Sequence, residues 1–315
     1  MLQFVLRRLA MLVATLVAAS FVIYGALYLA PGSPIATLTG GRTPPPEVLL
    51  ALETRYHLNE PFLVRYWLWL KAAVSGDLGE SIPLHEPVAT LIGERVGVTA
   101  SLVLLTSLII LFVGIGLGII GGLRRGGVDN AVLLSSTISA ALPSFAAAVV
   151  LQFVVGVKLG WLPVLGTGTG FSDSVKHLIL PAIALASTSV ALVTRVTRSA
   201  VMEEMGKEHV QTALSRGLPY PGLIRRHVLR NAAIPITTVA GLTIASLIAL
   251  AAIVETAFGL NGLGAYLVQA AMNKDFAVVQ GISLVLVAAF VITNVVIDIL
   301  YAVLDPRVQL GSRAQ

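Results

Sequence analysis

Long stretches without a charged residue constrain this chain more than any other feature. Asp, Glu, Lys and Arg are absent from residues 9–41, 96–123, 130–157, 177–194, 231–254, 256–273 and 276–297. A helix needs about 20 mostly apolar residues to cross the hydrocarbon core of a bilayer. Only 12% of the residues are charged, whereas soluble domains have about 25%. The sequence therefore predicts an all-α polytopic membrane protein.

The stretch 256–273 differs from the others because turn-forming and amide residues interrupt it, namely Gly259, Asn261, Gly262, Gly264, Gln269 and Asn273. Such residues favour loops over membrane helices. We predict a loop or re-entrant element there, which leaves six transmembrane helices. Residues 9–30 are longer than the roughly 7 to 15 apolar residues of a signal peptide. We therefore predict that they form a retained first helix.

The positions of the basic residues predict the orientation of the chain, since cytoplasmic segments carry an excess of Lys and Arg. With both termini cytoplasmic, most of the 21 basic residues fall on the inside, whereas acidic residues outnumber basic ones in the long segment 31–95. We predict a multi-pass membrane protein with both termini in the cytoplasm. The net charge of +5 follows from this topology, so we expect no nucleic-acid binding.

Two segments outside the membrane helices have patterns of their own, and the first is residues 31–95. It opens with prolines and continues with apolar residues that indicate short amphipathic helices, namely Leu49, Leu50, Leu52, Leu63, Trp67 and Leu68. Both a cap that only packs on the bundle and a docking surface for a solute-binding protein fit this pattern. We divide the chain into residues 1–30, this extracytoplasmic segment, and a core of residues 96–315.

The second segment, residues 197–235, carries six basic and three acidic residues, a net charge of +3. Val210, Ala213, Leu214 and Gly217 fall on one face at helical spacing, and Gly217 can close a helix in the left-handed conformation. Pro219 and Pro221 suit the start of a second helix. We predict two short helices with a bend. A net positive charge is expected of any cytoplasmic loop, so the charge by itself does not set this segment apart.

Within this segment, Gln211-Thr212-Ala213, Gly217 and the run from Arg226 to Pro235 resemble the EAA loop of ABC importer permeases. The sequence Arg-His-Val-Leu-Arg-Asn-Ala at 226–232 is similar to the motif of the dipeptide, oligopeptide and nickel branch of these permeases. Further motifs along the chain are similar to those of that branch and occur in the same order, including Gly76–Ser81, Glu255–Phe258 and Leu304–Arg307. Gln211 and Thr212 depart from the Glu and Ala usual in this loop.

The resemblance implies a type I importer fold and one half of a translocation path for di- or oligopeptides. It also implies four kinds of contact: a second homologous permease, two ATP-binding subunits that hold ATP and Mg, an extracytoplasmic solute-binding protein, and the lipid bilayer. The residues it assigns to coupling with the ATPase are Glu203, Gln211, Thr212, Ala213, Gly217, Leu218, Arg225, Arg226, His227, Arg230, Asn231 and Pro235.

Polar residues within apolar stretches are candidates for the path, namely Ser144, Gln152, Ser187, Thr188 and Ser189. Glu255 and Asp298 flank charge-free runs, and ionisable groups at membrane depth are functional candidates by default. Two roles are open for Asp298, a structural partner in a polar helix contact and a conformational lock. We treat the two residues as conformational candidates.

Motifs for catalysis or cofactor binding are missing from the sequence. It has no Gly-x-x-x-x-Gly-Lys-Ser/Thr text for ATP, no cysteine, and no metal-ligand spacing among its five histidines. The glycines at 116, 118 and 121 lie in a membrane stretch, and Gly114, Gly118 and Gly122 fit close helix contact better than cofactor binding. We predict a non-catalytic subunit without a cofactor. The alternative is a secondary transporter or channel subunit.

Overall fold

The computed structural model describes residues 2–29, 45–55 and 59–304, and within these ranges the regular structure is helical. Five continuous elements are long and apolar enough to cross a membrane. They are α1 (Leu2–Leu29), the joined α5 (Val88–Ile109), η1 (Ile110–Gly114) and α6 (Ile115–Leu123), α9 (Phe171–Met205), the joined α11 (Tyr220–Leu223), η3 (Ile224–Val228) and α12 (Leu229–Phe258), and α14 (Phe276–Leu304).

The remaining span, expected as one helix over 130–157, is bent instead. Helix α7 (Gly127–Ala141) is followed by α8 (Ser144–Leu151) and η2 (Gln152–Lys158), and the two halves meet at 99°. Leu142 and Pro143 have extended backbones, with ψ of 111° and 147°. The ring of a proline disfavours the helical conformation of the residue before it. With this bent pair counted as one span, the described residues contain the six candidate spans that the sequence predicts.

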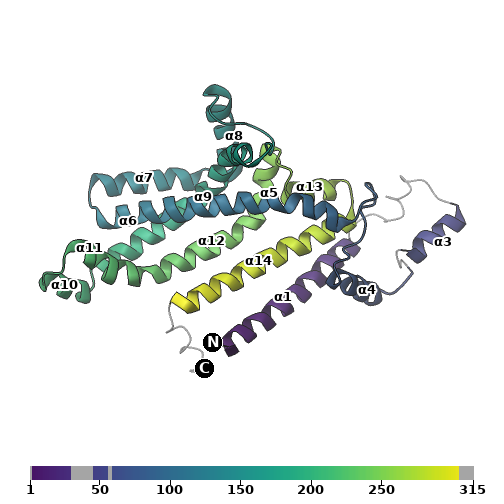
Figure 1. Ribbon diagram of the computed structural model, residues 1–315, viewed down its shortest axis with the longest axis horizontal. Coiled ribbons are helices and arrows are strands. Elements are labelled where there is room, and N and C mark those ends of the chain that lie inside the picture. Colours follow the sequence, from purple (N-terminus) through teal and green to yellow (C-terminus); the bar gives the residue numbers. More distant parts are fainter. Residues whose placement is uncertain (1, 30–44, 56–58, 305–315) are drawn as a thin grey trace.

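The seventh charge-free stretch does not form a span, as predicted. Helix α12 ends at Phe258, where Gly259 adopts a left-handed conformation with φ of 59°. Helix α13 (Leu263–Met272) has 10 residues, about half of what a bilayer crossing requires. It lies at the opposite end of the bundle from α10 and α11 (Figure 1).

Helix α9 is the central element, and it packs against α5, α6, α7, α8 and α12. It extends past the predicted 177–194 on both sides, to 35 residues, which is about 52 Å at 1.5 Å per residue. Its contact with α6 uses the predicted glycines. A Cβ atom on Gly122 would lie 2.8 Å from Val201, and one on Gly118 would lie 2.7 Å from the Thr194 carbonyl. The close helix contact at Gly114, Gly118 and Gly122 is confirmed.

Two short helices follow α1, as predicted for the segment 31–95: α3 (Pro46–Arg55) and α4 (Phe62–Val74). Residues 30–44 and 56–58 lie outside the described ranges. Aromatic rings join α4 to α1, with Phe21 and Tyr66 edge to face at 5.2 Å and the Ser20 and Tyr66 hydroxyls 2.9 Å apart. Trp67 on the other face of α4 is 64% exposed, which fits an amphipathic helix.

The helix that contains the charge-free run 96–123 begins before that run, because α5 starts at Val88. Glu94 and Arg95 ended the charge-free run, yet both lie within the helix. Arg95 donates to the Leu91 carbonyl at 2.7 Å and its guanidinium stacks 4.1 Å from the ring centre of Tyr266 on α13. These two contacts stabilise the guanidinium, so a charged residue can lie within this helix.

Candidate functional site

The segment between α9 and α12 contains two short helices, as predicted: α10 (Glu208–Ser215) and α11, which continues through η3 into α12. They lie at one end of the long axis, together with the turn between α6 and α7 (Figure 1). The predicted segment 197–235 overlaps both long helices. Residues 197–205 belong to α9, and Pro235 lies inside α12 rather than at its entry.

Gly217 closes α10 as predicted. Its φ is 76°, a conformation in which other L-residues are strained. The Gly217 N–H donates to the Leu214 carbonyl at 2.9 Å, and the Leu218 N–H donates to the Ala213 carbonyl at 3.2 Å. These bonds satisfy the last carbonyls of the helix and turn the chain toward α11.

The buried face of α10 is narrower than the sequence indicated. Val210 and Ala213 are buried in a cluster with Val201, Leu223 and Val228. Leu214, expected on the same face, is 49% exposed. Only one narrow face of so short a helix packs against the bundle. Val210 and Ala213, three residues apart, form that face. Leu214 is left outside.

A buried carboxylate ties the base of α10 to the two long helices. Glu204, near the end of α9, is 5% exposed. Its oxygens lie 2.7 Å from Lys207 Nζ, 3.2 Å from His209 Nε2 and 2.8 Å from Asn231 Nδ2. Asn231, on α12, also donates to the His227 carbonyl at 3.0 Å. The hydrogen bond with Glu204 raises the pKa of Lys207.

Glu204 is a residue that the sequence reasoning missed. The available signal was its spacing from Thr197 and Val201, seven and three residues earlier, which places it on the buried face of α9. Glu203, the predicted neighbour, is exposed and lies 3.6 Å from Lys207. The buried carboxylate is therefore one residue after the predicted one.

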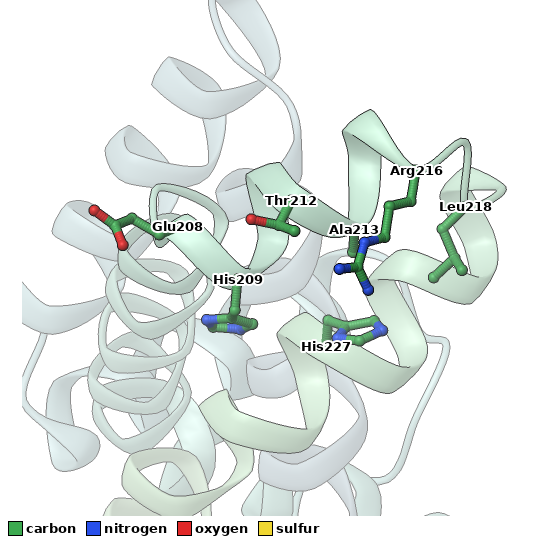
Figure 2. Close-up of a pocket in the computed structure, with 7 residues that line it drawn as sticks. All are labelled: Glu208, His209, Thr212, Ala213, Arg216, Leu218 and His227. Atoms are coloured by element: carbon green, nitrogen blue, oxygen red, sulfur yellow. The ribbon is translucent and has the colours of Figure 1, made fainter.

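A groove of about 540 Å³ lies next to this cluster, since His209 belongs to both, and it is shown in Figure 2. Four of the predicted residues line it, Thr212, Ala213, Leu218 and His227, and three others complete it: Glu208, His209 and Arg216. Gln211 lies outside the groove and donates to the Met205 carbonyl at 3.2 Å. Arg225, Arg226 and Arg230 are exposed beside it.

The five residues predicted for a path do not share one face. Ser187 and Thr188 of α9 hold the bend of the α7–α8 pair, since the Ser187 carbonyl accepts from Ser139 at 2.7 Å and Thr188 donates to the Leu142 carbonyl at 3.3 Å. Ser189 is buried, and Ser144 starts α8. Gln152 donates to the Ala257 carbonyl at 2.9 Å, which ties η2 to the end of α12.

Glu255 lies at the other end of α12 and is fully buried. It accepts hydrogen bonds from the Thr99 hydroxyl at 2.6 Å and from the Ala265 N–H at 2.9 Å, and Thr99 in turn accepts from the Leu263 N–H at 2.8 Å. The carboxylate thus joins α5, α12 and the first turn of α13, where the helix dipole favours a negative charge.

Asp298 on α14 forms an ion pair with Arg8 on α1, with 2.9 Å between Oδ2 and Nη1. The pair joins the first and last membrane helices, which lie side by side (Figure 1). This ion pair is compatible with both roles considered for Asp298, a structural partner in a polar helix contact and a conformational lock. Within the described ranges, no cluster of three His, Cys, Asp or Glu side chains could hold a metal ion.

The family models and the individual relatives that match this chain agree with one another, and the relatives cover nearly its whole length. Residues 114–310 match the family described as binding-protein-dependent transport system inner membrane component, and residues 1–103 match its N-terminal counterpart. The chain is 31% identical to the dipeptide transport system permease protein DppB of Alkalihalophilus pseudofirmus, over 98% of this chain and 100% of the relative. It is 33% identical to the oligopeptide transport system permease protein OppB of Salmonella typhimurium, again over 98% and 100%.

Proposed function

The chain belongs to the family of binding-protein-dependent transport system inner membrane components, and from this membership we propose that it forms one half of the translocation path of an ATP-driven importer of short peptides. Its relatives are named for dipeptide and oligopeptide transport. The proposed assembly contains a second homologous permease, two ATP-binding subunits and an extracytoplasmic solute-binding protein. In this proposal both termini, α10 and α11 lie on the cytoplasmic side of the bacterial inner membrane.

ATP and Mg are proposed to bind to the ATP-binding subunits, because this chain carries no Gly-x-x-x-x-Gly-Lys-Ser/Thr text. The chain would then contribute no catalytic residue. Its task is to convert the movement of the ATPases into a movement of membrane helices.

The contact that best supports this task is the Glu204 cluster at the base of α10. A partner that pushes on α10 acts at the same time on α9 through Glu204 and on α12 through Asn231. Both helices are long enough to cross the membrane. Helix α12 then carries the displacement to Glu255 and α13 at its other end, where an outer gate would lie.

The rigidity of the α10–α11 segment suits such a coupling element. Val210, Ala213 and Leu223 are buried against the ends of α9 and α12, and Gly217 fixes the turn between the short helices. The groove next to them would offer a surface for the ATPase. Three of the predicted path residues lie at the bend of the third span, since Ser187 and Thr188 form hydrogen bonds with it and Ser144 directly follows it.

The test is reconstitution of the complex purified through a tag on this chain. We expect two ATP-binding subunits and a second permease to copurify, and proteoliposomes to take up a labelled dipeptide when ATP is inside and the solute-binding protein is outside. The chain by itself should neither hydrolyse ATP nor transport. Uptake by the chain alone, or uptake driven by an ion gradient without ATP, would contradict the proposal and favour a secondary transporter.

A further inference from the structure

The charges of residues 197–235, which include α10 and α11, are unevenly neutralised. Arg198 pairs with Asp129 of α7, with 2.6 Å between Nη2 and Oδ2. Lys207 pairs with Glu204 at 2.7 Å and lies 3.6 Å from Glu203. Two of the three acidic groups of residues 197–235 are thus already used by cations at the base of the segment.

Four arginines of the same region remain, at positions 216, 225, 226 and 230. All four are exposed, and none forms a salt bridge with an acidic group in the part of the chain that the structure describes. The surface that the segment presents to a partner is therefore cationic. A complementary partner surface would be acidic.

Arg216 is the one of these four arginines that lines the groove. In Figure 2 its side chain extends over the groove toward His227, with Ala213 and Leu218 next to it. Glu208, the acidic residue among those lining the groove, lies at the opposite end, and its carboxylate points away from Arg216. The guanidinium of Arg216 and the imidazole of His227 thus both line the groove and lie next to one another in Figure 2.

We propose that this groove binds an aspartate or glutamate side chain of the ATP-binding subunit, with Arg216 as its ion-pair partner and His227 as a second hydrogen-bond donor. The inference rests on the proposed function, since it names the chemistry of the partner at the same surface. When the ATPase covers the groove, water leaves Arg216, and an unpaired desolvated cation is costly. A carboxylate offsets that cost and matches the planar guanidinium in geometry.

The position of the groove favours a protein over an anionic lipid as the source of the acceptor. Helices α10 and α11 extend beyond the start of α1 and the end of α14 along the long axis (Figure 1). Lipid head groups meet the bundle near the ends of the membrane helices. The groove lies further out, where a soluble subunit would dock.

A zero-length cross-link tests the proposal. Carbodiimide joins carboxylates to amines and does not join them to guanidinium groups, so Arg216→Lys creates a reporter at the groove of the purified complex. The matched control is Arg125→Lys, an exposed arginine in the α6–α7 turn at the same end of the bundle. We expect mass spectrometry to find residue 216 joined to an Asp or Glu of the ATP-binding subunit, at least about fivefold more than residue 125.

Equal cross-linking at 216 and 125, or an adduct of residue 216 with phosphatidylserine instead of protein, would overturn the inference while the ATPase is still present in the complex. If the ATPase is absent from the unmodified complex as well, the proposed function itself fails. A charge reversal gives a second reading. Arg216→Glu should reduce the retained ATPase about tenfold, and replacing the cross-linked partner carboxylate by Arg should restore it. No restoration would count against the pairing.

Discussion

The amide nitrogen of Asn231 donates a hydrogen bond of 2.8 Å to the buried carboxylate of Glu204. This contact joins the last turn of α9 to the first turn of α12, two helices that otherwise meet along their membrane-spanning lengths. Because Glu204 also holds Lys207 at the start of α10, three segments share one carboxylate. Through these contacts α10 is linked to both long helices.

Asn231→Asp should weaken this connection, because it replaces the amide donor by a second negative charge beside Glu204. A lost hydrogen bond to a charged group costs about 2 kcal/mol. We expect ATP hydrolysis to persist in the reconstituted complex and the amount of peptide taken up per ATP to fall. Asn261→Asp, in the exposed turn at the other end of α12, is the control for an added carboxylate. An unchanged ratio in Asn231→Asp would show that the contact does not transmit force.

Gly217→Val should disturb the turn after α10, because a side chain at φ of 76° is strained by about 1–2 kcal/mol. We expect less ATPase bound to the chain and lower peptide uptake at normal membrane abundance. Gly222→Ala is the control, since a Cβ there would make an ordinary contact of 3.8 Å with Pro219. If both variants transport like the unmodified protein, the turn geometry is not required for coupling.

Gly118→Val should destabilise the bundle, because a Cβ at this position would collide with Thr197 and lie 2.7 Å from the Thr194 carbonyl. Overpacking of this kind costs about 1–3 kcal/mol. Gly116→Val is a matched control on the same helix, because nothing lies within 4 Å of its Cβ. Thermal unfolding in detergent should show a lower Tm for Gly118→Val alone. Equal melting of the two variants would contradict the tight α6–α9 contact.

The membrane helices could be predicted from the sequence because hydrocarbon excludes unpaired charge, so charge-free runs mark most spans. Their ends could not be predicted in this way. Arg95 remains inside α5 because it stacks on Tyr266, and Arg195 remains inside α9 because it donates to Thr137 at 3.1 Å. Both partners, Tyr266 and Thr137, are distant in sequence from the arginines that they contact. The charge-free runs therefore could not reveal these contacts.

The bend of the third span illustrates the same limit. Pro143 breaks the helix between α7 and α8, whereas Pro181 and Pro235 lie inside α9 and α12. Which proline breaks a helix depends on the tertiary contacts that hold the chain on either side, such as Ser139 with Ser187. At the site, Ala213 and Gly217 could be predicted from spacing, but the Glu204 cluster depends on three segments meeting.

Glu255→Ala should release the first turn of α13, because it leaves the Ala265 N–H and the Thr99 hydroxyl without their acceptor. Each unsatisfied buried group costs about 1–3 kcal/mol. The chain has no cysteine, so Ala270→Cys, at a buried position of α13, can report opening by its rate of maleimide labelling. We expect faster labelling with Glu255→Ala and no change with Thr256→Ala, whose side chain is exposed. Equal rates would mean that other contacts hold α13.

The ion pair between Arg8 and Asp298 joins α1 to α14 at 2.9 Å between Nη1 and Oδ2. Breaking it should cost more than the 0 to 1 kcal/mol typical of an exposed pair in water, because the remaining charge would face lipid. We expect Arg8→Asp and Asp298→Arg each to lower the amount of folded protein in the membrane, measured by fluorescence-detected size exclusion. The doubly exchanged variant should recover most of it, since the pair is restored with reversed polarity. A double variant no better than the worse single one would show that Arg8 and Asp298 act through other neighbours.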